Sequence, residues 1–196
     1  MKKTLIGLFL VLGAASFADA GKVEAKGGID FGGKYHYNSG SQKTKNTSGE
    51  VGVEYRNEVI PGLEVGGGTA FQFHKDLKDK INGQNEKNYN SVPVYTTAKY
   101  TFDVPTSVKP YIKGDLGYSF NRGNYDHNSS ERYKAKNGLY YGAGGGISFN
   151  NVNIELMYKE NQGEYKYEGP VRVNSKYDAN YRRVSLGVGY NFNLGN

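Results

Sequence analysis

The strongest constraint on this chain is a strict two-residue alternation of apolar and polar side chains. Between residues 22 and 37, one set of alternate positions reads Val, Ala, Gly, Ile, Phe, Gly, Tyr and Tyr, and the other set carries most of the Lys, Glu and Asp. Successive side chains of a β-strand point to opposite faces, whereas a helix would spread these charges around its circumference. This segment therefore predicts one long strand with an apolar face and a charged face.

The same alternation recurs along the rest of the chain and predicts eight strands in all. The seven further strands cover residues 50–59, 63–74, 92–102, 112–120, 139–149, 152–159 and 183–192. Pro93 and Pro110 lie near the starts of two of them. Because proline cannot donate a hydrogen bond to a β-ladder, the sequence defines these two strand ends least well.

The links between the predicted strands alternate in length. Short links fall at residues 60–62, 103–107 and 150–151, and long polar links fall at 38–49, 75–90, 121–137 and 161–180. Short turns at one end and long loops at the other are typical of outer-membrane barrels. The predicted fold is an all-β, eight-stranded antiparallel up-and-down transmembrane β-barrel over residues 21–196.

The N-terminus predicts export. Lys2 and Lys3 precede an apolar stretch at residues 5–15, and Ala18-Asp19-Ala20 has the small-residue pattern of a cleavage site. These features indicate a cleaved signal peptide at residues 1–20, because a transmembrane helix needs about 20 apolar residues. Its removal leaves 23 basic and 18 acidic residues. No basic run or basic helix indicates nucleic-acid binding.

The composition fits a barrel better than a soluble or disordered chain. The sequence has 28 Gly, 18 Tyr, 9 Phe and no Cys, and its mean hydropathy is −0.69. In a transmembrane barrel only alternate strand residues face lipid, so a low mean hydropathy is compatible with many aromatic residues. Aromatic girdles are expected at both rims, formed by Tyr35 and Tyr37 at one and by Phe102, Phe149, Tyr190 and Phe192 at the other.

The polar face of the strands would line the lumen. Side chains can just fill an eight-stranded barrel, and charges buried there must be paired. Acids and bases on this face are nearly balanced, which predicts a lumen closed by salt bridges and little or no solute conduction. The predicted lumen charge network comprises Glu24, Lys26, Asp30, Lys34, Glu50, Glu54, Arg56, Glu58, Glu64, Lys99, Lys113, Asp115, Glu155, Lys159 and Arg183.

Two segments carry a resemblance to a known family. Residues 108–117 read Val-Lys-Pro-Tyr-Ile-Lys-Gly-Asp-Leu-Gly, and the spacing of Ser185, Gly187, Tyr190 and Phe192 is polar-x-Gly-x-x-aromatic-x-aromatic. The chain resembles the small eight-stranded outer-membrane barrels, such as the OmpA transmembrane domain, OmpX and the opacity-type proteins. The resemblance implies residence in the outer membrane of a diderm bacterium, among its lipids. It also implies assembly by the barrel-assembly machinery, which would read these four residues as an assembly signal.

The sequence is compatible with three functions. A structural or adhesin-like role, with a host or cell-surface ligand at the long loops, is favoured because loops on a rigid scaffold are usual recognition sites. The alternatives are a narrow channel and a lipid-modifying enzyme. Catalysis is disfavoured because the alternation places His36 and His74 in the lumen, away from lipid, and His127 in a loop. No catalytic, metal or cofactor site is predicted, and the glycines at 142–146 lack the spacing of a nucleotide loop.

Overall fold

The computed structural model describes residues 21–37, 40–44, 48–74, 89–128, 131–168 and 176–194. All regular structure within these ranges is β-strand. No helix among the described residues is long and apolar enough to cross a membrane. The predicted signal peptide at residues 1–20 lies outside the described residues.

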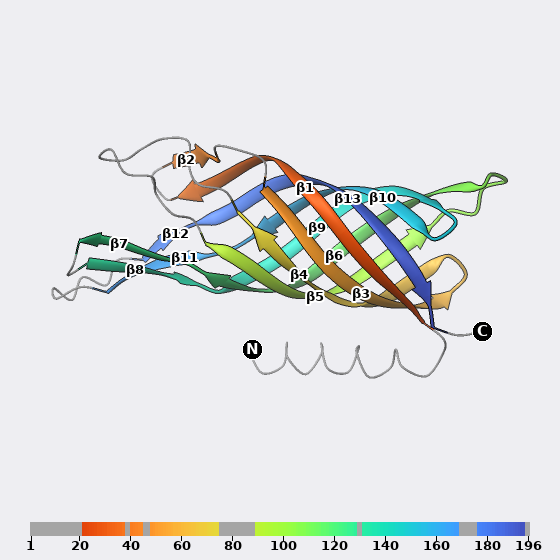
Figure 1. The fold of residues 1–196 in the computed structure, drawn as a ribbon, viewed down its shortest axis with the longest axis horizontal. Coiled ribbons are helices and arrows are strands. Elements are labelled where there is room, and N and C mark those ends of the chain that lie inside the picture. The colour runs from red at the N-terminus through yellow and green to blue at the C-terminus, as the bar shows by residue number, and fades with distance from the viewer. Residues whose placement is uncertain are drawn as a thin grey trace.

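Eight long strands close into a barrel, as Figure 1 shows. Each pairs antiparallel with its neighbour, and β1 pairs with the last strand from Lys22↔Asn193 to His36↔Asn180. The predicted fold class is thus confirmed. The strands are β1 (Lys22–Tyr37), β3 (Ser48–Ile60), β4 (Leu63–Phe73), β5 (Asn90–Thr101), β6 (Val108–Arg122), β9 (Gly138–Phe149), β10 (Val152–Asn161) and β13 (Asn180–Asn193).

Five short strands lie where the sequence predicted loops. They are β2 (Gly40–Lys43), β7 (Asn124–Asn128), β8 (Glu131–Lys136), β11 (Glu164–Glu168) and β12 (Lys176–Asp178). β2 pairs with the end of β1, and the other four form a second sheet in the order β12-β11-β8-β7. The loop prediction was wrong here, because these segments form backbone pairs without the apolar face that marks a barrel strand in sequence. The link at 75–88 lies outside the described residues.

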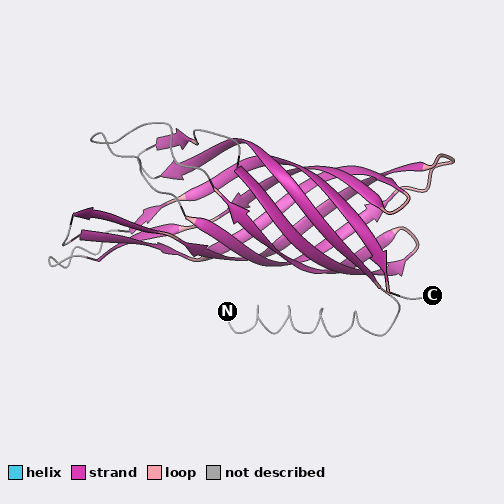
Figure 2. Ribbon diagram, viewed as in Figure 1, coloured by secondary structure: helices cyan, strands magenta, loops and turns pink. Residues whose placement is uncertain are grey.

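The two ends of the barrel differ. The three short connections lie at one end together with the last described residues, and the second sheet extends from the other end (Figures 1 and 2). Gly62 and Asn150 adopt φ angles of 82° and 52° in two of these turns. In outer-membrane barrels the short turns are periplasmic and the long connections extracellular. The two ends are therefore called the turn end and the outer end.

The barrel has an apolar exterior and a polar interior. Large apolar side chains point outward along all eight strands and form an apolar belt; Ile29 at 48 % exposure and Leu116 at 53 % are examples. At the turn end of the belt lie Phe102, Phe149, Tyr190 and Phe192, each at least 40 % exposed, as predicted for a girdle. Tyr35 is fully buried instead, so its predicted place in the outer girdle was wrong. The side chain of Tyr37 lies outside the described residues.

Candidate functional site

The lumen is the part of the molecule in which ionisable residues converge. Alternation along the eight strands turns one polar set inward, and these side chains are almost completely buried. Seven acids and six bases of the predicted network are buried, so the two signs nearly cancel. They are Glu24, Asp30, Glu50, Glu54, Glu64, Asp115 and Glu155, with Lys26, Arg56, Lys99, Lys113, Lys159 and Arg183.

Near the turn end, Arg56 is the centre of an ionic layer. Its guanidinium binds Glu24 and Glu54, and its Nε lies 3.1 Å from a Glu64 oxygen. Lys22, which is partly exposed at the mouth, also binds Glu64. A guanidinium has five N–H donors in one plane, so a single arginine can serve three carboxylates that come from three different strands. Lys99 closes the same level, with its Nζ 4.2 Å from the ring centroid of Tyr111.

The middle layer is organised by Glu54. Lys113 Nζ lies 2.7 Å and 2.9 Å from its two carboxylate oxygens, and Lys26 also binds it. The Tyr95 hydroxyl donates a hydrogen bond of 2.9 Å to the same group. Both lysines also approach Glu155, at 3.2 Å for Lys113 and 3.6 Å for Lys26. The Lys26–Glu54 contact joins the neighbouring strands β1 and β3, whereas the other contacts join strands that are not neighbours in the sheet and therefore cross the lumen.

Asp115 is buried beside this layer, at 4 % exposure. Among the described residues, neither of its carboxylate oxygens has a hydrogen-bond partner. Thr97 is its cross-strand neighbour on β5. The other acids of the lumen have direct cationic partners, so Asp115 is the least satisfied member of the predicted network.

A third ionic layer lies toward the outer end. Arg183 Nε is 3.0 Å from Asp30, and its Nη2 is 3.5 Å from Glu50. Lys159 binds the other oxygen of Glu50, and the Gln72 side chain donates to Glu50 at 3.1 Å. Burial of these ions is tolerable because each has a partner of opposite charge within ion-pair distance. Together the three layers fill the lumen with crossing contacts.

Neutral polar side chains fill the lumen between the ionic layers and the outer end. Asn161 donates to Gln72 at 2.9 Å and to Ser119 at 2.8 Å, and Ser91 donates to Asn121 at 2.8 Å. All five side chains are buried. This amide layer separates the ionic layers from the outer opening.

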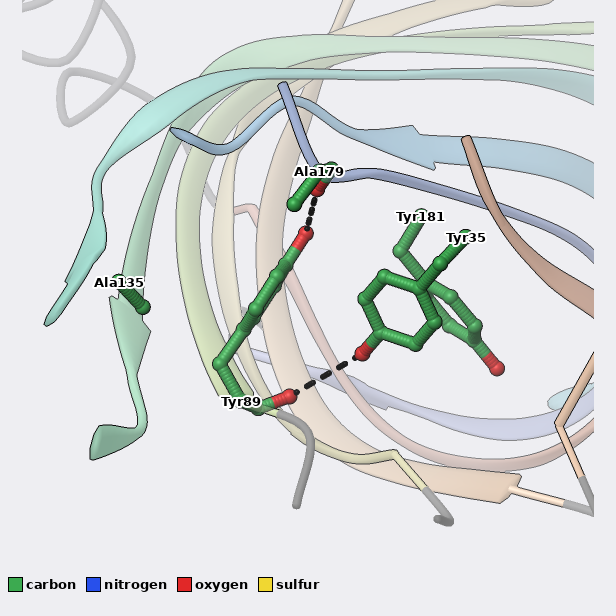
Figure 3. Close-up of a cluster of buried hydrophobic side chains, with 5 residues drawn as sticks. All are labelled: Tyr35, Tyr89, Ala135, Ala179 and Tyr181. Atoms are coloured by element: carbon green, nitrogen blue, oxygen red, sulfur yellow. Dashed lines mark hydrogen bonds between the residues drawn. The ribbon is translucent and has the colours of Figure 1, made fainter. Parts of the chain in front are cut away.

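An aromatic lid closes the outer end of the lumen, and Figure 3 shows its three tyrosines, Tyr35, Tyr89 and Tyr181. We define the lid as Tyr35, His74, Tyr89 and Tyr181. The rings of His74 and Tyr181 have centroids 4.1 Å apart, and those of Tyr35 and Tyr181 4.7 Å apart. The Tyr89 hydroxyl donates to the Ala179 carbonyl at 2.7 Å, and His74 Nδ1 lies 2.8 Å from the Tyr89 carbonyl. His74 thus faces inward, as the alternation predicts.

Lys34 was wrongly predicted to face the lumen, because β1 contains a bulge. The β1–β13 register shifts between Phe31 and Lys34, and Gly32 has a φ of 62°, a left-handed conformation that glycine adopts readily. The extra residue exchanges the two faces beyond it. Lys34 is therefore exposed and Tyr35 buried. His36, also predicted to face inward, lies on the outer surface beside Lys34.

Glu58 was also wrongly assigned to the buried network of the lumen. It lies directly opposite Glu64 on β4, but it is exposed because β3 reaches the turn here. Its carboxylate accepts a hydrogen bond of 2.7 Å from the Gly62 backbone N–H. Glu58 therefore stabilises the turn between β3 and β4.

The proposed assembly-signal residues all lie on β13. Ser185 is buried in the lumen, and a Cβ at Gly187 would contact Glu155 Cγ at 3.0 Å, so this glycine makes room for an ionic side chain. Tyr190 and Phe192 point outward at the turn end, with ring centroids 4.9 Å apart. The structure thus divides the four residues between the two faces of one strand.

Sequence reasoning missed the neutral residues that complete the lumen. Tyr89 and Asn161 lie in links that the sequence predicts as loops, and Gln72 lies on the polar face of a predicted strand. The sequence does contain a signal for them, because a bulky polar residue at an inward-facing position near a strand end must lie in the opening of the barrel.

Metal binding or catalysis would require a further arrangement of side chains besides these buried ion pairs. Among the described residues, no group of three or more His, Asp or Glu side chains could hold a metal ion. One nucleophile–base contact lies outside the barrel, where Ser41 Oγ is 2.8 Å from His36 Nδ1. A serine hydrolase also needs a group that orients the histidine.

Comparisons with known proteins agree with this geometry. A family model described as the outer membrane protein beta-barrel domain matches residues 5–195. The uncharacterized protein PM1543 of Pasteurella multocida is 25 % identical over 98 % of both chains. Neisserial surface protein A shares 21 % identity and a TM-score of 0.54 over 89 % of this chain and 98 % of that one. The outer membrane protein OprG of Pseudomonas aeruginosa shares 14 % identity and a TM-score of 0.51, over 89 % of this chain and 96 % of that one.

Proposed function

The chain belongs to the outer membrane protein β-barrel family, and from this we propose that it is a closed barrel that displays an interaction surface outside the cell. Its lumen would conduct little or no solute, and its extended hairpins would contact a host or cell-surface ligand. The observation that carries the closed lumen is the stack of three ionic layers, the amide layer and the aromatic lid.

Glu54 makes opening of the lumen costly. This carboxylate lies within ion-pair distance of Lys26, Arg56 and Lys113 at once. Opening a path would separate at least one of these cations from its partner, and an uncompensated buried charge costs several kcal/mol. The packed state should therefore be by far the most populated.

Planar-bilayer recording tests closure. The purified protein is expected to give no large, stable conductance. A stable conductance would contradict the closed lumen, and a small, ion-selective one would favour the narrow channel. Under the channel alternative, Glu50→Gln would change ion selectivity, since this carboxylate lies in the lumen.

The surface role rests on the second sheet. β7, β8, β11 and β12 extend beyond the apolar belt at the outer end (Figure 2). A cleft of about 640 Å³ opens where this sheet leaves the barrel, with charged and amide groups on its walls. Its lining includes Lys136, Gln162, Glu164, Lys166, Asp178 and Asn180. Such a mixed lining suits a polar ligand.

Deletion of individual hairpins tests the surface role. Shortening the β7–β8 hairpin or the β11–β12 hairpin should reduce binding of expressing cells to a target surface. Heat-modifiable gel mobility would show that each shortened barrel is folded. Unchanged cell binding after both deletions, with folded barrels, would contradict this role.

We propose that the protein is not an enzyme, although one contact favours the alternative of lipid modification. His36 and Ser41 lie 2.8 Å apart on the outer surface rather than in the lumen. Mass spectrometry of outer-membrane lipids from cells with the wild-type protein, a Ser41→Ala variant or no protein separates the two cases. A lipid change that needs Ser41 would establish catalysis, and identical lipids in all three would support the non-enzymatic proposal.

A further inference from the structure

The bulge in β1 creates a row of positive charge on the outside of the barrel. Lys34, turned outward by the bulge, lies directly opposite Lys43 of β2 and directly opposite Arg182 of β13. Lys34 and Lys43 are exposed, and the Arg182 side chain is 41 % exposed. Three cations thus stand side by side on three neighbouring strands.

This row marks the outer edge of the apolar belt. On the same strands, the next outward-facing residues toward the membrane are Phe31 and Val184, at 45 % and 40 % exposure. Tyr158 of β10 continues the belt at 43 %. The row therefore lies at the level where the lipid head groups of the outer leaflet begin.

The charges in the row are only partly compensated by the protein. Glu160 of β10 faces Arg182 and binds its Nε at 2.8 Å. Neither Lys34 nor Lys43 has an acidic partner within ion-pair distance in the described part of the chain. Like charges directly opposite each other on a sheet are destabilising. A bulge that places a further lysine there is therefore costly unless an anion from outside completes the site.

We infer that Lys34, Lys43 and Arg182 form a binding site for the phosphate groups of outer-leaflet lipids. Lysine and arginine are the residues that bind phosphate, and a head group here would leave its acyl chains against Phe31 and Val184. The site goes beyond the surface role proposed above and does not depend on the hairpins. A failure of hairpin-dependent binding would therefore leave it untouched.

The test is a binding titration of the folded barrel in zwitterionic micelles. The probes are diphosphorylated lipid A, the same lipid without its phosphates, and inorganic phosphate. Each basic residue near an anionic surface contributes about fivefold to binding, so the Lys34→Gln/Lys43→Gln variant should bind lipid A roughly 25-fold more weakly. The backbone amide NMR signals of Lys34 and Arg182 should move on binding, and that of Lys109 at the turn end should not.

Two matched controls locate the effect. Lys109→Gln removes a partly exposed lysine at the turn end, and Arg122→Gln removes an exposed arginine at the outer end of β6, on another side of the barrel. Both should bind lipid A as the wild type does. Heat-modifiable mobility confirms that every variant is folded.

Several results would overturn the inference. The double variant could bind lipid A unchanged, or either control could lose as much affinity. Equal binding of the dephosphorylated lipid would show that phosphate is not recognised. Inorganic phosphate that saturated the same amides as tightly as lipid A would overturn the assignment to a lipid.

Discussion

Lys113 Nζ lies 2.7 Å from Glu54 Oε1, although the two residues are 59 positions apart and lie on strands separated by two others. The contact crosses the lumen from β6 to β3. It ties one wall of the barrel to another in a way that the hydrogen bonds of the sheet cannot.

Replacing Glu54 should destabilise the barrel more than any other single change in the lumen. Glu54→Gln removes the charge that faces Lys26, Arg56 and Lys113, and we expect a loss of about 3–5 kcal/mol in the free energy of unfolding. Urea unfolding in lipid vesicles measures it. Glu58→Gln makes the same chemical change four residues away at an exposed turn position, and should cost far less. Equal losses in the two variants would show that the ionic layers do not hold the barrel together.

The bulge in β1 predicts which of two cysteine variants can be labelled from outside the cell. We expect Lys34→Cys to react with a membrane-impermeant maleimide on whole cells and Tyr35→Cys to be protected, because Lys34 is exposed and Tyr35 is fully buried. An unbroken alternation along β1 would give the opposite result. Gel-shift detection of the labelled protein separates the two.

The conformation of Gly32 provides a second measure of the bulge. Its φ of 62° costs an ordinary L-residue roughly 1–2 kcal/mol, and asparagine tolerates it better. Gly32→Val should therefore lower the unfolding midpoint more than Gly32→Asn. No atom outside the immediate chain neighbours lies within 4 Å of a Cβ built at this position, so crowding does not explain a difference.

Acid should weaken one contact at the turn end. The hydrogen bond donated by Lys109 at 2.7 Å, together with its charge, lowers the pKa of the exposed Asp103 carboxyl. Because the folded-state pKa lies below the unfolded value of about 3.9, this stabilisation is present above that pH and is lost as the pH falls through the folded-state pKa. In Lys109→Gln the Asp103 pKa should rise to its ordinary value. A ¹³C titration of the carboxyl signals measures it, and an unchanged pKa would contradict the contact.

The proposed assembly signal predicts a kinetic defect rather than an unstable barrel. Phe192 is 51 % exposed and outside the lumen, so Phe192→Ala should slow the appearance of the heat-modifiable form in cells. Refolding of the purified variant into detergent should be nearly unchanged. Phe102→Ala, a similarly exposed aromatic residue at the same end, is the control and should assemble at the wild-type rate.

The sequence by itself determined the barrel. Alternation from Val23 to Phe31 is a local property of extended backbone, so it can be read without knowing any partner strand. The contrast between the turn at Pro61-Gly62 and the long polar links likewise needs only chain order. Most inward charges follow from the same parity, and 13 of the 15 residues predicted for the network are buried in the lumen.

Only the tertiary structure decided which charges meet and where parity breaks. Glu54 of β3 binds Lys113 of β6, and Glu50 of β3 binds Lys159 of β10, because closure of the sheet sets these strands at a particular stagger, which no local pattern encodes. The bulge at Gly32 depends on the pairing of β1 with β13, and a glycine in an alternating segment is equally compatible with regular strand. For that reason Lys34, assigned by sequence to the lumen, lies on the outer surface beside Arg182.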